Sequence, residues 1–415
     1  MGNHTEGSAL PQQSCARVRR PRRNVVSAIA AALAWVILIG CGDVYRPVAN
    51  PVLKPGGDPQ ALRIALVLSS NSGAPGMATA VDVSGDTNIG NFVIGRGAVQ
   101  AAFKNSASVA LVANKDDDTV SLLAPNTQGS TVITITLPAG SAPVFVGSTE
   151  GSIVYVANSG TNSIGGINLS SAIQQSSFPV GPTPVALAET PDATRLYSVN
   201  QGNGTVTAID PRSGAVLDPA IPVGASPVAA AINSTGSTLY VLNQGSGTVS
   251  VIDTASNTIT ATVSTGASPR FLSYDSHLRR LYVANTGSNT ISVFSADVGL
   301  TPLATVTVGA GPASIAPLPD GTRVYVANAG CSDAVNLAGC SGNTVTVVDA
   351  LSFAVRKTIT VGSAPVSLAA DAASTKVVVA NRDSDSISAI RTSDDTIINT
   401  IASAAPKPLF VTVSP

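Results

Sequence analysis

Residues 239–253 read LYVLNQGSGTVSVID, and nearly the same words recur at residues 196–210 (LYSVNQGNGTVTAID) and 281–295 (LYVANTGSNTISVFS). Each copy consists of two short runs rich in Val, Ile, Thr and Tyr, which favour β-strands. The Gly, Asn and Ser residues between the runs mark a tight turn. Each copy therefore predicts an antiparallel hairpin, and its recurrence predicts a fold assembled from equivalent units.

Two recurring residues give the length of the repeat independently. An asparagine ends the first run of each copy, and a proline follows a Val-Gly pair or a similar segment between copies. The asparagines are Asn71, Asn114, Asn158, Asn200, Asn243, Asn285, Asn328 and Asn381, and the prolines are Pro143, Pro184, Pro227, Pro269, Pro312, Pro365 and Pro408. Both series advance by about 43 residues, a period typical of repeat folds. In both series one step is about ten residues longer than the others, because of the insertion CSDAVNLAGC (331–340).

One unit contains four strand-like segments, as in PVAAAIN, STLYVLN, GTVSVID and TITATVSTG within residues 227–266. Four short strands per repeat of roughly 40 to 45 residues is the period of a β-propeller blade. A single blade cannot bury both of its faces, so blades stack in a ring and their middle strands need apolar residues on both faces. The eight asparagines predict an all-β, eight-bladed propeller of four-stranded antiparallel blades over residues 61–415. Seven blades is the alternative, if the degenerate first unit (65–95) packs as an appendage.

The end of the chain predicts how the ring closes. KPLFVTVSP (407–415) has the form of the proline-led inner strand but has no strands after it. The first unit lacks such an inner strand. We therefore expect the C-terminal strand to complete the first blade.

The repeated words also match a known family. LYVANTG, VYVANAG and IVYVANSG, followed by TVSVID and then VGxxP, resemble the YVTN-repeat β-propeller family of surface and periplasmic proteins. The resemblance covers about residues 61–415 and implies the propeller fold. That family is usually taken to be seven-bladed, so eight asparagines are a departure from it.

The N-terminal residues have the pattern of an export signal. RVRRPRRN (17–24) is positively charged, and VVSAIAAALAWVILIG (25–40) is apolar except for Ser27. This stretch is shorter than the about 20 residues of a membrane span, although a short transmembrane anchor is the alternative. Leu38-Ile39-Gly40-Cys41 resembles the lipobox of bacterial lipoproteins. The resemblance implies cleavage after Gly40 and acylation of Cys41, with palmitate-type chains.

These features divide the chain into three parts. Residues 1–40 are expected to be a lipoprotein signal peptide, residues 41–60 a lipidated cysteine with a flexible Pro/Gly-rich tether, and residues 61–415 the propeller. We expect an exported protein anchored to a membrane of the bacterial cell envelope, on the periplasmic side or the cell surface, with the outer membrane favoured.

Composition and motifs argue against several classes of protein. Apolar residues make up 44% of the chain and charged residues 11%, which is too apolar for a disordered protein. Five arginines precede Cys41 and the remainder is net acidic, so no nucleic-acid groove is expected. His277 is the one histidine after the signal, expected at the surface of a loop. The sequence lacks GxSxG and GxxxxGK[ST], so we predict no catalytic residues, no cofactor and no enzyme.

Two groups of residues remain as candidate sites. Cys331 and Cys340 are expected to form a disulfide, which suits an exported protein, and they lack the two further ligands of a zinc site. The loops NKDDDT (114–119) and NRDSDS (381–386) carry clustered carboxylates that could hold calcium. The calcium candidates are Asp116, Asp117, Asp118, Asp383 and Asp385. Turn formation is the stronger interpretation, because Asp and Asn in tight turns bond their own backbone. One repeated turn likewise explains the regular asparagines.

The sequence favours a binding or scaffolding module of the cell envelope. We label the strands of a blade a to d from the inside outward. A protein or envelope-component partner is expected on the face that carries the b–c and d–a loops, where the 331–340 insertion rises. The membrane is contacted through the lipid, and the protein is expected to be a monomer. A hydrolase or lactonase-like enzyme at the mouth of the central channel is one alternative, and a structural spacer is another. The mostly small, uncharged inner strands argue against the enzyme.

Overall fold

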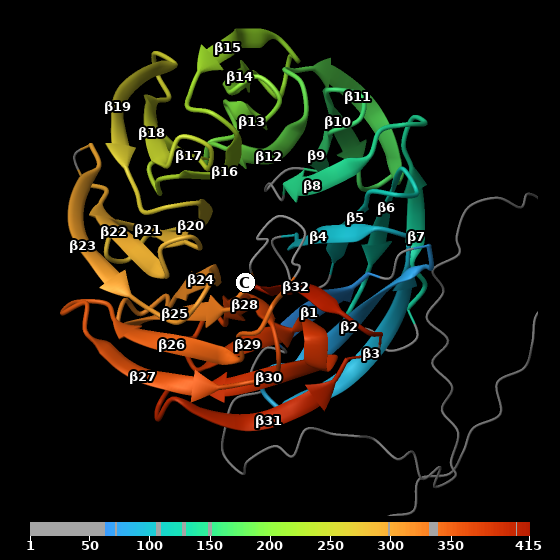
Figure 1. Cartoon of the computed structure of the whole chain (residues 1–415). Helices are drawn as coiled ribbons and strands as arrows, with labels where there is room; N and C mark the ends of the chain where they lie inside the picture. The colour runs from blue at the N-terminus through green and yellow to red at the C-terminus, as the bar shows by residue number, and fades with distance from the viewer. Residues whose placement is uncertain are drawn as a thin grey trace, which may run out of the picture. The chain divides into compact units, whose positions relative to one another are not determined.

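The computed structural model describes residues 63–415, apart from residues 71–72, 105–108, 127–129, 148–151, 298, 332–338 and 404. The expected signal peptide, Cys41 and the tether therefore lie outside the described residues. The described chain forms eight four-stranded antiparallel sheets. They stand around a common centre, with one strand of each sheet facing it (Figure 1). The prediction of an eight-bladed propeller is confirmed, and the seven-bladed alternative is wrong.

Each blade runs from an inner strand a to an outer strand d. Blade 1 contains β32 (Pro408–Val413), β1 (Ile64–Ser69), β2 (Gly76–Asp82) and β3 (Thr87–Ile94), and blade 2 contains β4 (Ala98–Phe103), β5 (Ala110–Asn114), β6 (Thr119–Leu123) and β7 (Ile133–Thr136). Blade 3 contains β8 (Pro143–Gly147), β9 (Ile153–Asn158), β10 (Ser163–Asn168) and β11 (Ile173–Pro179), and blade 4 contains β12 (Pro184–Glu189), β13 (Leu196–Asn200), β14 (Thr205–Ile209) and β15 (Val216–Pro222).

Blades 5 to 8 continue the same order. Blade 5 contains β16 (Pro227–Ile232), β17 (Thr238–Asn243), β18 (Thr248–Asp253) and β19 (Thr258–Ser264), and blade 6 contains β20 (Pro269–Asp275), β21 (Arg280–Asn285), β22 (Thr290–Ser295) and β23 (Thr301–Thr307). Blade 7 contains β24 (Pro312–Pro317), β25 (Arg323–Asn328), β26 (Thr344–Asp349) and β27 (Val355–Thr360), and blade 8 contains β28 (Pro365–Ala370), β29 (Lys376–Asn381), β30 (Ser386–Arg391) and β31 (Thr396–Ala402). A short 3-10 helix, η1 (Arg382–Ser384), follows β29. Within the described residues, no helix is long and apolar enough to cross a membrane.

The ring closes between the two ends of the folded chain, as predicted. Strand β32 pairs antiparallel with β1, with Val413 opposite Ala65. The backbone N–H of Ser414 donates to the carbonyl of Ile64 (2.8 Å), and the N–H of Ile64 donates to the Ser414 hydroxyl (3.1 Å). Strand β32 also contacts β28 and β4, the inner strands of the two flanking blades.

Burial explains why the repeated phrase is apolar on both faces. All the residues of β17 after Thr238 are buried, whereas every residue of the outer strand β19 is exposed or only partly buried. The b and c strands lie between neighbouring blades, so each of their faces contacts another sheet. The tyrosine of the phrase adds a polar tie between blades, since the Tyr240 hydroxyl donates to the carbonyl of Ala296 in the next blade.

The repeated asparagine connects strands b and c. Asn243 is fully buried, and its amide donates to the hydroxyls of Thr248 (3.1 Å) and Ser250 (2.9 Å) on β18. The same pair of bonds is made by Asn114, Asn200, Asn285, Asn328 and Asn381. The sequence had suggested a repeated turn. The asparagine does flank the turn, but its side chain cross-links the two strands beside it.

Blade 1 departs from the asparagine pattern. Asn71 lies outside the described residues. The position that pairs with the first residue of the inner strand is Ser69, opposite Pro408, just as Asn243 is opposite Pro227. Ser69 is buried, and its hydroxyl bonds that of Ser403 (2.9 Å). The spacing of Asn71 therefore predicted the blade correctly but marked the wrong residue within it.

Each Val-Gly pair before an inner strand ends in glycine because the asparagine of the next blade leaves no room for a Cβ atom there. A Cβ atom on Gly224 would lie 2.8 Å from the Cβ of Asn243, and one on Gly181 would lie 2.6 Å from the Nδ2 of Asn200. Real Cβ atoms are essentially never found this close to another heavy atom. Glycine and asparagine therefore form one packing unit between the d–a connection and strand b.

Candidate functional site

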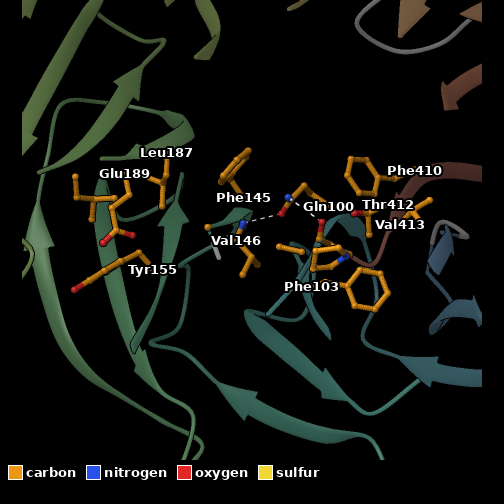
Figure 2. Close-up of a pocket in the computed structure, with 15 residues that line it drawn as sticks. Gln100, Phe103, Phe145, Val146, Tyr155, Leu187, Glu189, Phe410, Thr412 and Val413 are labelled. Atoms are coloured by element: carbon orange, nitrogen blue, oxygen red, sulfur yellow. Dashed lines mark hydrogen bonds between the residues drawn. The ribbon is translucent and has the colours of Figure 1, made fainter. Parts of the chain in front are cut away.

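A cavity of about 520 Å³ lies where the inner strands of blades 1 to 4 end (Figure 2). We call this side of the ring, which carries the a–b connections, the a–b face, and the opposite side, where the inner strands begin, the proline face. The cavity is lined by Gln100, Ala101, Ala102, Phe103, Phe145, Val146, Gly147, Tyr155, Leu187, Glu189, Leu196, Phe410, Thr412, Val413 and Pro415. A volume of this size is typical of a small-molecule site.

Three phenyl rings from three blades belong to the apolar lining. Phe103 ends β4, Phe145 lies on β8 and Phe410 lies on β32. Figure 2 shows them in the part of the cavity that also contains Gln100 and Val146. One of these rings, that of Phe410, lies on β32, so the closing strand of the propeller supplies part of the cavity wall.

Two polar side chains of the lining, Gln100 and Tyr155, are already bonded within the protein. The Gln100 Oε1 accepts from the backbone N–H of Val146 (2.7 Å), and its Nε2 donates to the carbonyl of Ala101 (3.0 Å). The Tyr155 hydroxyl donates to the carbonyl of Pro211 (3.0 Å). Glu189 differs, because its buried Oε2 has no hydrogen-bond partner among the described residues.

Burial without a partner changes the acidity of Glu189. Desolvation raises the pKa of its carboxyl to about 7, and the positive charge of Lys104 opposes this shift to a smaller extent. Burial also raises the pKa of the Tyr155 phenol, with further contributions from the negative charges of Glu189 and Asp210. Glu189 therefore changes charge near neutral pH, unlike an ordinary surface carboxyl.

Glu189 stands on the wall between two cavities. A second cavity of about 380 Å³ shares Leu187 and Glu189 with the first and continues along β16 and β20 to Tyr274. The sixth residue of the inner strand is Glu189 in blade 4, whereas Phe103, Ile232, Tyr274, Pro317, Ala370 and Val413 occupy this position in other blades. The sequence interpretation missed Glu189, although it was detectable as the acid at a position that is elsewhere uncharged.

The charge state of Glu189 should make the stability of the protein depend on pH. Its pKa is about 7 in the folded protein and near the ordinary 4.5 when unfolded, so the folded state holds the proton more tightly. The stabilisation that the Glu189 proton gives to the folded protein is therefore fully present below about pH 4.5 and is lost as pH rises through 7. We expect Glu189→Gln to raise the Tm at pH 8 relative to wild type and to leave a smaller difference at pH 5.

Scanning calorimetry of both proteins from pH 5 to pH 8 measures this difference. Asp218→Asn, which changes a carboxyl on the outer strand β15, is the matched control and is measured at the same pH values. A difference between Glu189→Gln and wild type that stays constant with pH would contradict the shifted pKa.

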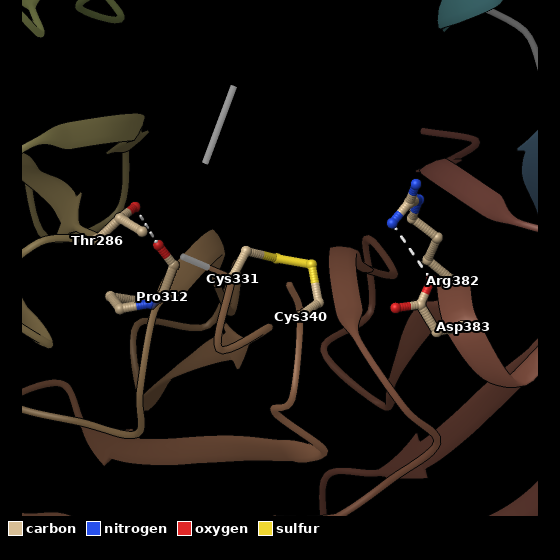
Figure 3. The surroundings of a disulfide bond; sticks show 6 residues. All are labelled: Thr286, Pro312, Cys331, Cys340, Arg382 and Asp383. Atoms are coloured by element: carbon tan, nitrogen blue, oxygen red, sulfur yellow. Dashed lines mark hydrogen bonds and ion pairs between the residues drawn. A yellow bond between two sulfur atoms is a disulfide. The ribbon is translucent and has the colours of Figure 1, made fainter. Parts of the chain in front are cut away.

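The two cysteines form a disulfide on the other side of the ring. Cys331 and Cys340 are joined (Figure 3) at the base of the insertion between β25 and β26. They pack against an apolar cluster made of Ala313, Ala329, Ala364 and Val366, which connects blades 7 and 8. Residues 332–338 of the insertion lie outside the described residues. Figure 3 shows the disulfide between the Thr286–Pro312 hydrogen bond (2.8 Å) and the Arg382–Asp383 ion pair (3.2 Å). The disulfide lies in a b–c connection, on the proline face, whereas the cavity lies on the a–b face.

The calcium candidates of the first loop are bonded to the neighbouring d–a connections. Asp117 accepts from the backbone N–H (2.7 Å) and Nε (2.5 Å) of Arg96, and these bonds help to lower its pKa. Asp118 accepts from the N–H groups of Gly140 and Ala142, both at 2.7 Å. Asp116 lies against Gly97, where an added Cβ would touch its carboxyl group.

The second loop repeats this arrangement. Asp385 accepts from the backbone N–H of Lys407 (2.7 Å), and Asp383 pairs with Arg382. Ala142 and Lys407, whose N–H groups are bonded, have φ values of 43° and 58°, a left-handed conformation that is costly for residues with a Cβ. Asp118 and Asp385 thus help to hold the residues that precede the inner strands β8 and β32. Within the described part of the chain, no three His, Cys, Asp or Glu side chains are grouped so as to bind a metal.

His277 lies in the β20–β21 connection, the loop position expected from the sequence. Its backbone N–H donates to Asp275 Oδ1 (2.8 Å). The enzyme alternative required several His, Arg, Asp or Glu side chains in one opening. Of these, the described lining of the 520 Å³ cavity contains Glu189. A separate cavity of about 530 Å³, between blades 6, 7 and 8, is lined by His277, Asp320, Arg323, Asp349 and Arg356 among others. Two of its charged side chains, Arg356 and Asp349, form an ion pair (3.1 Å).

Comparison with known proteins identifies the fold. A family model described as YNCE-like beta-propeller matches residues 77–333. No curated protein matches the sequence. Among solved structures, the dihydro-heme d1 dehydrogenase NirN, in complex with DHE, is similar with a TM-score of 0.70 and 12% identity, over 89% of this chain and 78% of that one.

Two further structures are similar over most of their lengths. Hydrazine synthase of Kuenenia stuttgartiensis has a TM-score of 0.58 and 18% identity, over 71% of this chain and 96% of that one. A putative 6-phosphogluconolactonase from Bacteroides fragilis has a TM-score of 0.56 and 16% identity, over 86% of this chain and 99% of that one. At these identities the likeness shows the propeller fold alone.

Proposed function

The chain belongs to the YNCE-like β-propeller family, and from this premise we propose that it is an exported, lipid-anchored binding protein whose ligand occupies the cavity on the a–b face. The observation that carries the proposal is the 520 Å³ cavity lined by three phenylalanines and Glu189. Concave, mostly apolar sites with a few polar groups are typical of small-molecule binding.

Binding is better supported than catalysis. All three of the similar structures reported above are named as enzymes, a hydrazine synthase, a dehydrogenase and a putative lactonase. Covalent catalysis of hydrolysis would need a nucleophile and a base within hydrogen-bond reach of each other. The Oε2 of Glu189 has no such partner among the described residues, and Tyr155 is bonded to a backbone carbonyl. A carboxyl with a raised pKa can also recognise a ligand without reacting with it.

The proposal includes the location of the protein. The charged and apolar stretches before Cys41, together with the lipobox-like LIGC, support a lipoprotein signal peptide over residues 1–40 and a tether over residues 41–60. The protein is then a YVTN-like lipoprotein of the cell envelope, with the outer membrane favoured. A protein or envelope component could dock on the proline face around the Cys331–Cys340 insertion, and we propose a monomer that does not bind nucleic acid.

Cys41→Ala is expected to release the protein from the membrane or to leave the precursor uncleaved, because the thiol that receives the lipid is absent. Two or more acyl chains give stable attachment, whereas a single chain is marginal. Detergent phase partitioning and the mass of the mature protein measure this change. The matched control is Cys331→Ala, which should partition with the membrane like wild type. Unchanged partitioning of Cys41→Ala would refute the lipid anchor.

Ligand binding can be tested with a fluorescent residue placed in the cavity. Trp35 is the one tryptophan of the chain, so Trp35→Phe with Phe145→Trp carries a single fluorophore, in the cavity. We expect the neutral apolar dye N-phenyl-1-naphthylamine to bind, brighten and accept energy from the introduced tryptophan.

The control carries its tryptophan at Phe353, in the turn after β26 on blade 7, and should transfer energy much less efficiently because it is remote from the cavity. A dye that does not bind, or that receives energy equally from both positions, would contradict a binding site in this cavity.

A further inference from the structure

The 520 Å³ cavity combines aromatic walls with a carboxyl group whose buried Oε2 has no hydrogen-bond partner among the described residues. We propose that its ligand has an apolar or aromatic body and one protonated amine, and that Glu189 is the counter-ion of that amine. This inference rests on the binding function proposed above. It adds the chemical class of the ligand and the residue that selects it.

The polar groups of the lining favour a hydrogen-bond donor as ligand. Gln100 and Tyr155 are already bonded to backbone groups, whereas the Oε2 of Glu189 accepts no hydrogen bond from the residues that the structure describes. A buried acceptor without a donor is costly, so a ligand that supplies the donor gains more than an ordinary hydrogen bond. An ammonium group supplies both a donor and the opposite charge, and such charge-assisted bonds are roughly twice as strong as neutral ones.

The walls of the cavity suit the rest of such a ligand. Phe103, Phe145 and Phe410 offer aromatic faces, which bind apolar groups and also attract cations through the ring quadrupole. An anionic ligand is disfavoured because it would place a second negative charge beside Glu189. A neutral alcohol would occupy the same space but would not provide the charge.

Several titratable groups face Glu189 and set the conditions for ionisation. Lys104, after β4, favours the charged carboxyl, but burial outweighs it. Tyr155 on β9 is close enough for the Glu189 charge to raise its own pKa, and Tyr274 on β20 lines the adjoining cavity. With the pKa of Glu189 at about 7, the empty site is partly protonated at neutral pH, and binding a cation should release that proton.

The experiment compares an amine with its neutral analogue in the full chain. Displacement of N-phenyl-1-naphthylamine by 2-phenylethylamine and by 2-phenylethanol measures the two affinities at pH 6 and pH 8. We expect the amine to bind about tenfold or more tightly than the alcohol at pH 8. Its affinity should fall roughly tenfold at pH 6, as Glu189 takes up a proton, while the affinity of the alcohol stays constant.

Two variants assign the effect to Glu189. Glu189→Gln should lose both the preference for the amine over the alcohol and the pH dependence of amine binding. Asp218→Asn removes a carboxyl on the outer strand β15 and should behave as wild type. A circular dichroism spectrum and a cooperative melting transition like those of wild type show that each variant is folded.

Several outcomes would overturn the inference. They are equal affinities for the amine and the alcohol, no displacement of the dye by the amine, and an amine preference that survives Glu189→Gln. In all three the dye still binds, so the proposed binding function stands. Failure of the dye to bind wild type would instead reject that function.

Discussion

Deletion of residues 408–415 is expected to abolish cooperative unfolding and to leave the protein insoluble. Strand β32 is the inner strand of blade 1, and its removal exposes the backbone edge of β1 together with buried side chains such as Leu66 and Leu68. Its contacts with β28 and β4, on the two flanking blades, would also be lost. An unpaired, apolar edge promotes association between chains. Soluble yield and scanning calorimetry of the truncated protein measure the effect.

A rearranged chain provides the control for this deletion. Residues 407–415 can be placed between residues 62 and 63 and joined to Arg63 by a copy of TPDATR (190–195), which connects strands a and b in blade 4. The same strand then enters the blade as an ordinary hairpin, so solubility and cooperative melting should return. Deletion of Gly42–Gln60, in the proposed tether, should be tolerated. A truncated protein that melts cooperatively would show that β32 does not hold the ring closed.

Asn243→Ala is expected to lower the free energy of unfolding by roughly 3 kcal/mol, because two hydrogen bonds between β17 and β18, one buried and one partly buried, are lost. The substitution also removes atoms that fill the space over Gly224. Urea denaturation at equilibrium measures the loss, provided that the slope of the transition stays unchanged.

Asn88→Ala is the matched control for this substitution. Asn88 lies exposed on the outer strand β3, where its amide bonds the side chain of Asn91, and its loss should change the stability by no more than about 0.5 kcal/mol. Equal effects of the two substitutions would show that the buried asparagine contributes no more than a surface residue.

The two predictions concern strand β32, whose role the sequence predicted, and the repeated asparagine, whose bonding partners it did not predict. The strand β32 was predicted in place and in role, because its proline-led pattern could be compared with the other copies along the chain. The asparagine was recognised as a repeated residue, but the hydroxyls to which its side chain donates were not predicted. Its bonds run to hydroxyls that the sequence also repeats, at Thr248 and Ser250, yet nothing in their spacing indicates which atoms face each other.

The sequence by itself determined the period, the number of blades and the closure of the ring. These depend on alternating apolar residues and turn residues, whose effects act within a few positions along the chain and are repeated in every unit. The tertiary structure decided that Ser69 occupies the asparagine position of blade 1, that Asp118 and Asp385 hold the next inner strand, and that Glu189 lies on a cavity. Each of these depends on contacts between residues that are distant in sequence. The environment of Glu189 is set by Tyr155, Lys104 and the phenylalanines of three other blades, and the burial that raises its pKa exists only when the ring is assembled.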